Sequence, residues 1–269
     1  YYSTIGGKGT TGIIISATLR LEKIVSESMI IEKIFFNDIK DLKKKFLKNK
    51  RKEYAVAWVD NLSDKYNGIL FFGAHSKKKT ISSQKTEEFI IPTFIINFLN
   101  LFNSKTFFTY FFNILFKLKN YIKKKENNNI FDFFFIQDTI LNWNEVFKKK
   151  GFFQFQYRCS LNNLEDNLKK LQILFKNNNI FSNFMVIKFY IKNNKIYNTV
   201  SLDIIKNSNF KQVSDVLNYF TNKNNLDVSL SKDSIITKIN DRIRKSNKFL
   251  INKNFDKNFE SLFSIRMKN

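Results

Sequence analysis

The glycines of this chain are concentrated at its beginning. Four of the seven lie within the first twelve residues, in the run GGKGTTG: Gly6, Gly7, Gly9 and Gly12. Glycine serves where the backbone takes a positive φ or passes close to a ligand. In a chain with so few glycines, this cluster predicts a ligand-binding turn. The apolar run that follows predicts a strand over residues 12–22.

The order of turn and strand distinguishes this cluster from the common nucleotide-binding motifs. In dinucleotide-binding and P-loop motifs the glycines follow a strand and open a helix. Here they precede the expected strand, so neither motif fits. A turn that binds no ligand is the alternative interpretation.

Composition limits the class of protein. With 269 residues and 43% hydrophobic content, the chain can form one large or two small domains with a real core. A net charge of +23 is typical of nucleic-acid-binding proteins. However, the abundant Lys, Asn, Ile and Phe all have A/T-rich codons, and the lysines occur in short, scattered runs. We therefore expect no nucleic-acid partner, but phosphates or acidic lipid surfaces remain candidates.

Cysteine and histidine exclude further chemistry. The single Cys159 cannot form an internal disulfide, and the single His75 cannot build a metal site, so we expect no metal. We interpret His75 as a surface or loop residue. No signal peptide is visible, which favours a cytoplasmic location or one peripheral to the inner membrane. Because the chain opens inside a ligand-type loop without Met, we expect a fragment.

Hydrophobic patterning predicts an α+β fold, with a largely antiparallel sheet and helices covering one face. No internal repeat is visible. Helices are expected at 37–48, 163–175 and 210–222, with Asn37 capping the first and Asn162 and Glu165 the second, and a loop at 121–129. Strands are expected at 28–36, 54–60, 67–73, 131–137, 152–159, 184–191, 197–205 and 226–231.

Residues 89–118 are rich in Phe and Ile but are interrupted by Pro92 and several polar residues. No uninterrupted run reaches the roughly 20 apolar residues that a membrane span needs. Two short helices, or a helix and a loop, are expected. A peripheral contact with a membrane surface and an ordinary buried helical pair are equally good interpretations.

Polar side chains alternate with apolar ones along three strands. In GFFQFQYRC, Gln154, Gln156 and Arg158 share one face, and in NTVSLDII, Thr199, Ser201 and Asp203 do. Lys188 lies among apolar neighbours in MVIKFYI. A sheet with one solvated face explains this pattern. Uncharged amides in a Lys-rich chain also suit a pocket that binds a polyol or a flavin edge.

Several short motifs together resemble a known family. The run GGKGTTGIIISATLRL resembles the end of the FAD-binding domain in the vanillyl-alcohol oxidase family. Further motifs occur in the order found in decaprenylphosphoryl-β-D-ribose 2′-oxidases: YAVAWVD, NWNEVF, GFFQFQ, the Lys188 strand, NTVSLD and SKDS. The resemblance covers nearly the whole chain, but only the C-terminal part of those enzymes.

The resemblance implies a site and a domain division. FAD would lie along Gly6, Gly7, Gly9, Thr11, Gly12, Ile13 and Ile14. The flavin and substrate pocket would be lined by Trp58, Phe134, Gln154, Gln156, Lys188, Thr199 and Ser201. Lys232 would lie near the flavin pyrimidine and Lys188 near the substrate, both as catalytic residues. Residues 1–24 would end the FAD-binding domain, and residues 25–269 would form the substrate-binding cap domain.

The implied function is oxidation of the 2′-hydroxyl of a polyprenylphosphoryl ribose by hydride transfer to FAD. A separate NAD(P)H-dependent reductase would then complete epimerisation to arabinose. The sequence departs from the family at Ser201, where mycobacterial members carry cysteine, and at Phe134, where tyrosine is usual. A sugar-acid or aldonolactone oxidase and a basic nucleic-acid-binding protein are the alternatives.

Overall fold

The computed structural model describes residue 4, residues 12–77, residues 90, 92 and 93, and residues 105–122, 125–134, 141, 152–205, 209–230, 236 and 238. These residues form an eight-stranded antiparallel sheet and five helices, which confirms the expected α+β class. The strands are β1 (Ser28–Phe36), β2 (Tyr54–Val59), β3 (Gly68–His75), β4 (Lys125–Asn129), β5 (Phe152–Ser160), β6 (Ser182–Lys192), β7 (Lys195–Ile205) and β8 (Asp227–Val228). The helices are α1 (Ile39–Lys48), α3 (Lys105–Ile122), α4 (Ile130–Phe134), α5 (Leu164–Asn177) and α6 (Phe210–Lys223).

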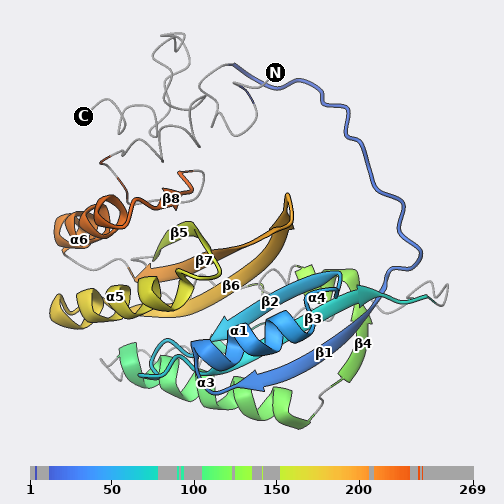
Figure 1. Ribbon diagram of the computed structural model, residues 1–269, viewed down its shortest axis with the longest axis horizontal. Helices are drawn as coiled ribbons and strands as arrows, with labels where there is room; N and C mark the ends of the chain where they lie inside the picture. The colour runs from blue at the N-terminus through green and yellow to red at the C-terminus, as the bar shows by residue number, and fades with distance from the viewer. Residues whose placement is uncertain are drawn as a thin grey trace.

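The sheet consists of two halves with the same topology. Its strand order is β4-β1-β3-β2-β6-β7-β5-β8 (Figure 1). The first half runs β1-α1-β2-β3-α3-β4 and the second β5-α5-β6-β7-α6-β8, so each is a β-α-β-β-α-β motif. The halves join where Ala55–Val59 of β2 pairs with Met185–Phe189 of β6. This repeat is a property of the topology, since the sequence shows none.

One face of the sheet carries the main core. Helices α1, α5 and α6 pack on it and contribute Leu42, Leu168 and Leu217, all fully buried. Phe46 of α1 stacks on Phe189 of β6 at 4.2 Å between ring centroids. The alternation along each strand places its other side chains on the opposite face.

Helices α3 and α4 lie on that opposite face. The ring centroid of Phe116 in α3 lies 4.8 Å from that of Trp58 in β2. The residues on either side of Trp58, Ala57 and Val59, belong to the main core on the other face. Phe134 of α4 lies 4.9 Å from Tyr54. Helices therefore cover both faces of the first half, and not one face only as the sequence suggested. In the second half, the described helices cover the core face alone.

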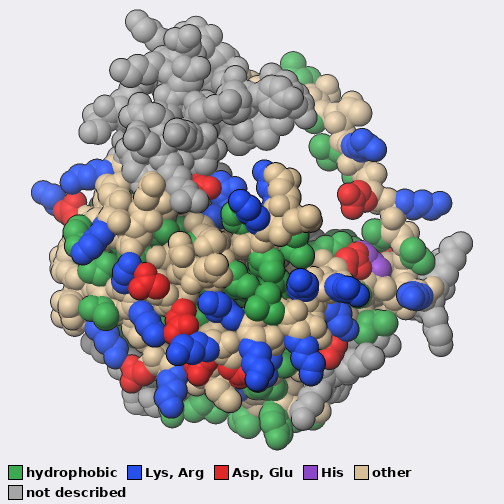
Figure 2. All heavy atoms as spheres, viewed as in Figure 1, with side chains coloured by type: hydrophobic (Ala, Val, Ile, Leu, Met, Phe, Trp, Pro, Cys, Tyr) green, Lys and Arg blue, Asp and Glu red, His purple; other side chains and the backbone are tan. Residues whose placement is uncertain are grey.

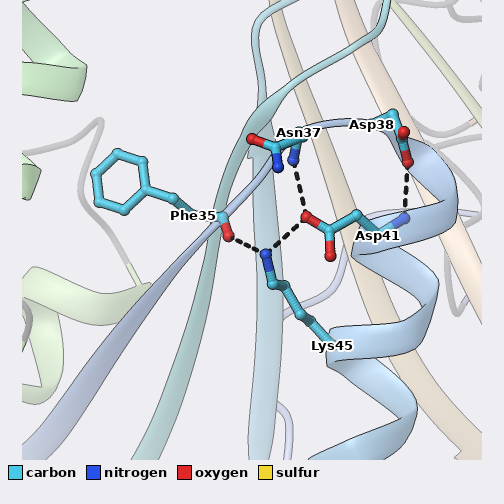
Figure 3. A network of polar contacts seen from close by, with 5 residues as sticks. All are labelled: Phe35, Asn37, Asp38, Asp41 and Lys45. Carbon is cyan, nitrogen blue, oxygen red and sulfur yellow. Dashed lines mark hydrogen bonds and ion pairs between the residues drawn. The ribbon is translucent and has the colours of Figure 1, made fainter.

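The start of α1 differs from the expected cap. Asp38, not Asn37, is the N-cap residue: its Oδ1 accepts the backbone N–H of Asp41 at 2.8 Å (Figure 3). Asn37 contributes its backbone N–H, which donates to Asp41 Oδ2 at 3.0 Å. Lys45 Nζ binds the same carboxylate oxygen and the carbonyl of Phe35. The Asp41 carboxylate therefore ties the first turn of the helix to the end of β1.

Two predicted elements have a different secondary structure. Residues 131–134 of the expected strand 131–137 belong to helix α4 (Ile130–Phe134) instead, and residues 135–137 lie outside the described residues. Asn129 Oδ1 accepts the N–H of Phe131, and Asp132 Oδ2 accepts the N–H of Asn129, so a reciprocal cap outweighs the β-propensity of the aromatic residues. The expected loop at 121–129 holds strand β4, which pairs with Ser28–Glu32 of β1. Because β4 depends on pairing with a strand distant in sequence, its own residues carry no hydrophobic pattern that predicts a strand.

Two further predictions are wrong. Residues 12–22 form no strand; this segment is extended, and Ile13, Ile15 and Leu21 are more than 80% exposed. A strand needs a hydrogen-bonded neighbour, and the described residues offer none there. The cap expected from Asn162 and Glu165 is also absent, because Glu165 binds Lys169 at 2.8 Å and the N-cap Asn163 makes no side-chain cap bond.

Candidate functional site

Strand register brings the predicted substrate-binding side chains together. One rung of the sheet runs Gln156–Ser201–Val186–Trp58 across β5, β7, β6 and β2. The next rung runs Arg158–Thr199–Lys188–Val56. Side chains of neighbouring rungs on one face lie about 7 Å apart along a strand. The polar rows therefore form a continuous surface on the face opposite the main core.

Four side chains of these rungs keep their polar groups available. Among the described residues, no side-chain hydrogen bond or ion pair involves Gln156, Lys188, Thr199 or Ser201; we call these four the polar set. Lys188 is exposed, whereas Gln156 and Ser201 are half-buried and Thr199 is 8% exposed. The polar set thus combines partial desolvation with free donors and acceptors, as a ligand-binding surface requires.

Neighbouring polar side chains are already paired. Gln154 Nε2 donates to Asp203 Oδ1 at 2.9 Å, and Asp203 is only 2% exposed. Arg158 forms a 2.7 Å ion pair with Asp227 of β8. Gln154 is a predicted substrate-binding residue, but the structure uses its amide to satisfy a buried carboxylate. The alternating sequence pattern predicts that Asp203 lies on this face. It does not predict that Asp203 is buried, because burial depends on tertiary packing.

Trp58 and Phe134 lie on the same face but play different parts. The ring of Trp58 is 3% exposed beneath Phe116, and Lys117 Nζ lies 5.9 Å from its centroid. Trp58 is therefore covered by α3, borders the polar set, and is not accessible to a ligand. Phe134 is 42% exposed and packs on Tyr54, one same-face step along β2 from the Lys188 rung.

A buried carboxylate, which the sequence interpretation missed, positions α3 beside this surface. Asp60, which follows β2, accepts Asn113 Nδ2 at 2.7 Å and Lys117 Nζ at 2.5 Å. Its position two residues after Trp58 puts it on the same face. The only signal in the sequence is an acidic residue directly after an apolar strand.

The predicted cofactor residues are described only in part. Gly12 has a φ of +132°, and a Cβ placed there would meet nothing within 4 Å. This backbone fits the inference that the turn needs glycine. Ile13 and Ile14 are 82% and 64% exposed. The remaining residues, Gly6, Gly7, Gly9, Thr11 and Lys232, lie outside the described residues.

The expectation that His75 is a surface or loop residue is not met. His75 ends β3, its side chain is 11% exposed, and Nδ1 lies 2.9 Å from the carbonyl oxygen of Ser26. It borders an open hollow of about 260 Å³ between residues 22–25 and the adjoining ends of β2 and β3. No described cluster of three or more His, Cys, Asp or Glu side chains could hold a metal ion.

No protein-family model matches the chain, and no curated protein matches its sequence. Within the part that the structure describes, no helix has the length and apolar character to cross a bilayer.

Proposed function

We propose that this chain is the substrate-binding part of an FAD-dependent oxidoreductase that oxidises the 2′-hydroxyl of a polyprenylphosphoryl ribose. The observation that carries the proposal is the polar set: Gln156, Lys188, Thr199 and Ser201 lie together on three neighbouring strands, and no other described residue binds their side chains. The family resemblance assigns these same positions to the substrate pocket, and the strand alternation found them independently.

The chemistry of the polar set suits a sugar phosphate. The Gln156 amide and the Thr199 and Ser201 hydroxyls can each donate to and accept from sugar hydroxyls. Lys188 supplies a cation for a phosphate, and charge-assisted hydrogen bonds of this kind are the stronger class. Arg158 is neutralised by Asp227, so Lys188 is the free cation among the described residues of the two rungs.

The cofactor part of the proposal rests on fewer described residues. The left-handed backbone of Gly12 and the open space around it allow close approach of a ligand. Ile13 and Ile14 present apolar surface that needs a cover, which the FAD-binding domain and its cofactor would supply. When bound, FAD would accept the hydride from the substrate carbon. Lys188 would orient the sugar phosphate, and a separate NAD(P)H-dependent reductase would act on the keto product.

The test measures binding of farnesylphosphoryl ribose to the chain by calorimetry. Replacing Lys188→Met or Gln156→Leu is expected to weaken binding about tenfold, as loss of one such hydrogen bond does. Lys192→Met is the matched control. Lys192 is exposed on the same strand as Lys188, and it lies opposite Lys195 at the end of the β6–β7 hairpin, away from the two rungs. Equal affinities of all three variants, or no binding at all, would overturn the proposal.

Flavin provides a second readout. Because the resemblance covers only the C-terminal part of those enzymes, the chain alone is expected to purify colourless. Flavin absorbance at about 450 nm in the purified chain would contradict this expectation.

Competing ligands separate the alternatives. An aldonolactone oxidase would bind a free lactone as tightly as the sugar phosphate and would be insensitive to Lys188→Met. A nucleic-acid-binding protein would bind RNA or DNA with a steep salt dependence. The face in Figure 2 argues against this, because its Lys and Arg side chains are interspersed with Asp and Glu. Ion pairs of helix α5, Lys169–Glu165 and Lys170–Asp166, likewise place opposite charges beside one another.

A further inference from the structure

Helix α3 packs several polar side chains, together with Phe116, against the sheet and leaves an apolar side exposed. Thr109, Asn113 and Asn120 are at most 5% exposed. The opposite side is apolar and 39–80% exposed, and we call it the outward face of α3: Tyr110, Phe111, Ile114, Leu115, Leu118 and Ile122. Figure 2 shows hydrophobic side chains along the lower edge of the molecule, where Figure 1 places α3.

Specific polar contacts set this orientation. Asn113 and Lys117 bind the Asp60 carboxylate, and Thr109 Oγ1 donates to Asn183 Oδ1 at 3.2 Å. Turning the helix to bury its apolar residues would break these bonds and leave the backbone N–H of Leu62 as the remaining donor described for the buried Asp60 carboxylate, which is costly. The outward face is therefore a fixed feature of the fold.

Charge indicates what covers this face. The stretch 105–122 contains no Asp or Glu, and Lys123, Lys124 and Lys125 follow it in the sequence. On a helical wheel of about 100° per residue, Lys119 borders the apolar arc on one side, and Lys117, whose charge is paired with Asp60, borders the other. An apolar arc with aromatic residues and a basic border is the pattern of a helix that lies in the plane of a membrane interface. Lys119 and the run Lys123–Lys125 supply positive charge that attracts anionic headgroups.

We propose that the outward face of α3 docks on an anionic lipid surface. This inference does not depend on the proposed oxidoreductase, because it rests on α3 alone. The two fit together, since α3 packs on the same face of the sheet as the polar set. Docking would hold that surface at the membrane, where a lipid-linked sugar phosphate resides.

The test is sedimentation of the full chain with vesicles. Phosphatidylcholine vesicles containing phosphatidylglycerol are compared with vesicles of phosphatidylcholine alone. We expect binding to the anionic vesicles, weakened by salt, and about a tenfold loss in the double variant Ile114→Ser with Leu118→Ser. The matched control is Ile173→Ser with Ile191→Ser, which removes exposed isoleucines from α5 and β6 and should bind as the unchanged chain does.

A second measurement avoids reliance on the double variant. Leu118→Trp should shift its fluorescence to the blue on anionic vesicles, whereas Ile173→Trp should not. Equal binding to neutral vesicles, equal binding by the double variant, or no shift for Leu118→Trp would overturn the proposal. A dimer that is lost in the double variant would overturn it too, by assigning the face to a second copy of the chain.

Discussion

The carboxylate of Asp60 accepts a hydrogen bond from Lys117 Nζ at 2.5 Å and so joins the end of β2 to α3. The side chains are 11% and 31% exposed, so the pair is largely shielded from water. Asn113 occupies the other carboxylate oxygen. This contact decides which side of α3 meets the sheet.

Asp60→Ala should lower the free energy of unfolding by about 2 to 3 kcal/mol, because Asn113 and Lys117 lose a shared buried acceptor. Urea unfolding monitored by circular dichroism measures the change. Asp64→Ala is the control: it removes an exposed partner of Lys176 and should leave the midpoint unchanged. If both variants unfold together, the Asp60 contacts do not stabilise the fold.

Gly68→Ala should destabilise the protein by about 3 kcal/mol, since overpacking against a fixed backbone cannot relax. The new Cβ would lie 2.1 Å from the Trp58 carbonyl oxygen and 2.6 Å from the Phe36 ring. Gly73→Ala should cost only about 1 kcal/mol, because the atoms it would meet belong to the movable side chains of Phe133 and Met29. Thermal unfolding compares the two, and the reverse ranking would contradict the β2–β3 packing.

Asp38→Ala should cost about 1 kcal/mol, the usual effect of losing an N-cap side chain. Asn37→Ala should change stability by less than about 0.5 kcal/mol, because Asn37 uses its backbone N–H alone. Denaturant midpoints of the two variants distinguish the observed cap from the one that the sequence suggests. A larger effect at Asn37 would identify that residue as the cap.

Acid should remove the contribution of Asp41. Burial by itself would raise the pKa of this carboxyl, but hydrogen bonds from Lys45 and the Asn37 N–H, with the charge of Lys45, outweigh it and lower the pKa below 3.8. A lowered native pKa stabilises the fold above 3.8, and that contribution is lost as the pH falls through the native value. Stability measured from neutral pH downward should fall less steeply in Asp41→Asn than in the unchanged chain.

Local patterns in the sequence predicted most strands of the sheet and most helices that pack on it. Period-two alternation located β5, β6 and β7 and separated Gln156 and Ser201 from the core, because a strand commits alternate side chains to opposite faces. Apolar stripes located α1, α5 and α6 in the same way. The residue types that make up the polar surface therefore follow from the amino-acid sequence alone.

Only the tertiary structure determines which strands pair and which side chains lie side by side. Register across β2, β6, β7 and β5 places Trp58, Lys188 and Gln156 in neighbouring rungs, and no local pattern encodes such pairing between strands distant in sequence. No local pattern encodes β4 either, because this strand depends on pairing with β1. Segment 12–22 has the pattern of a strand but pairs with no described residue. Buried Asp60 orients α3 with its apolar side outward, since satisfying a shielded carboxylate outweighs burying a hydrophobic stripe.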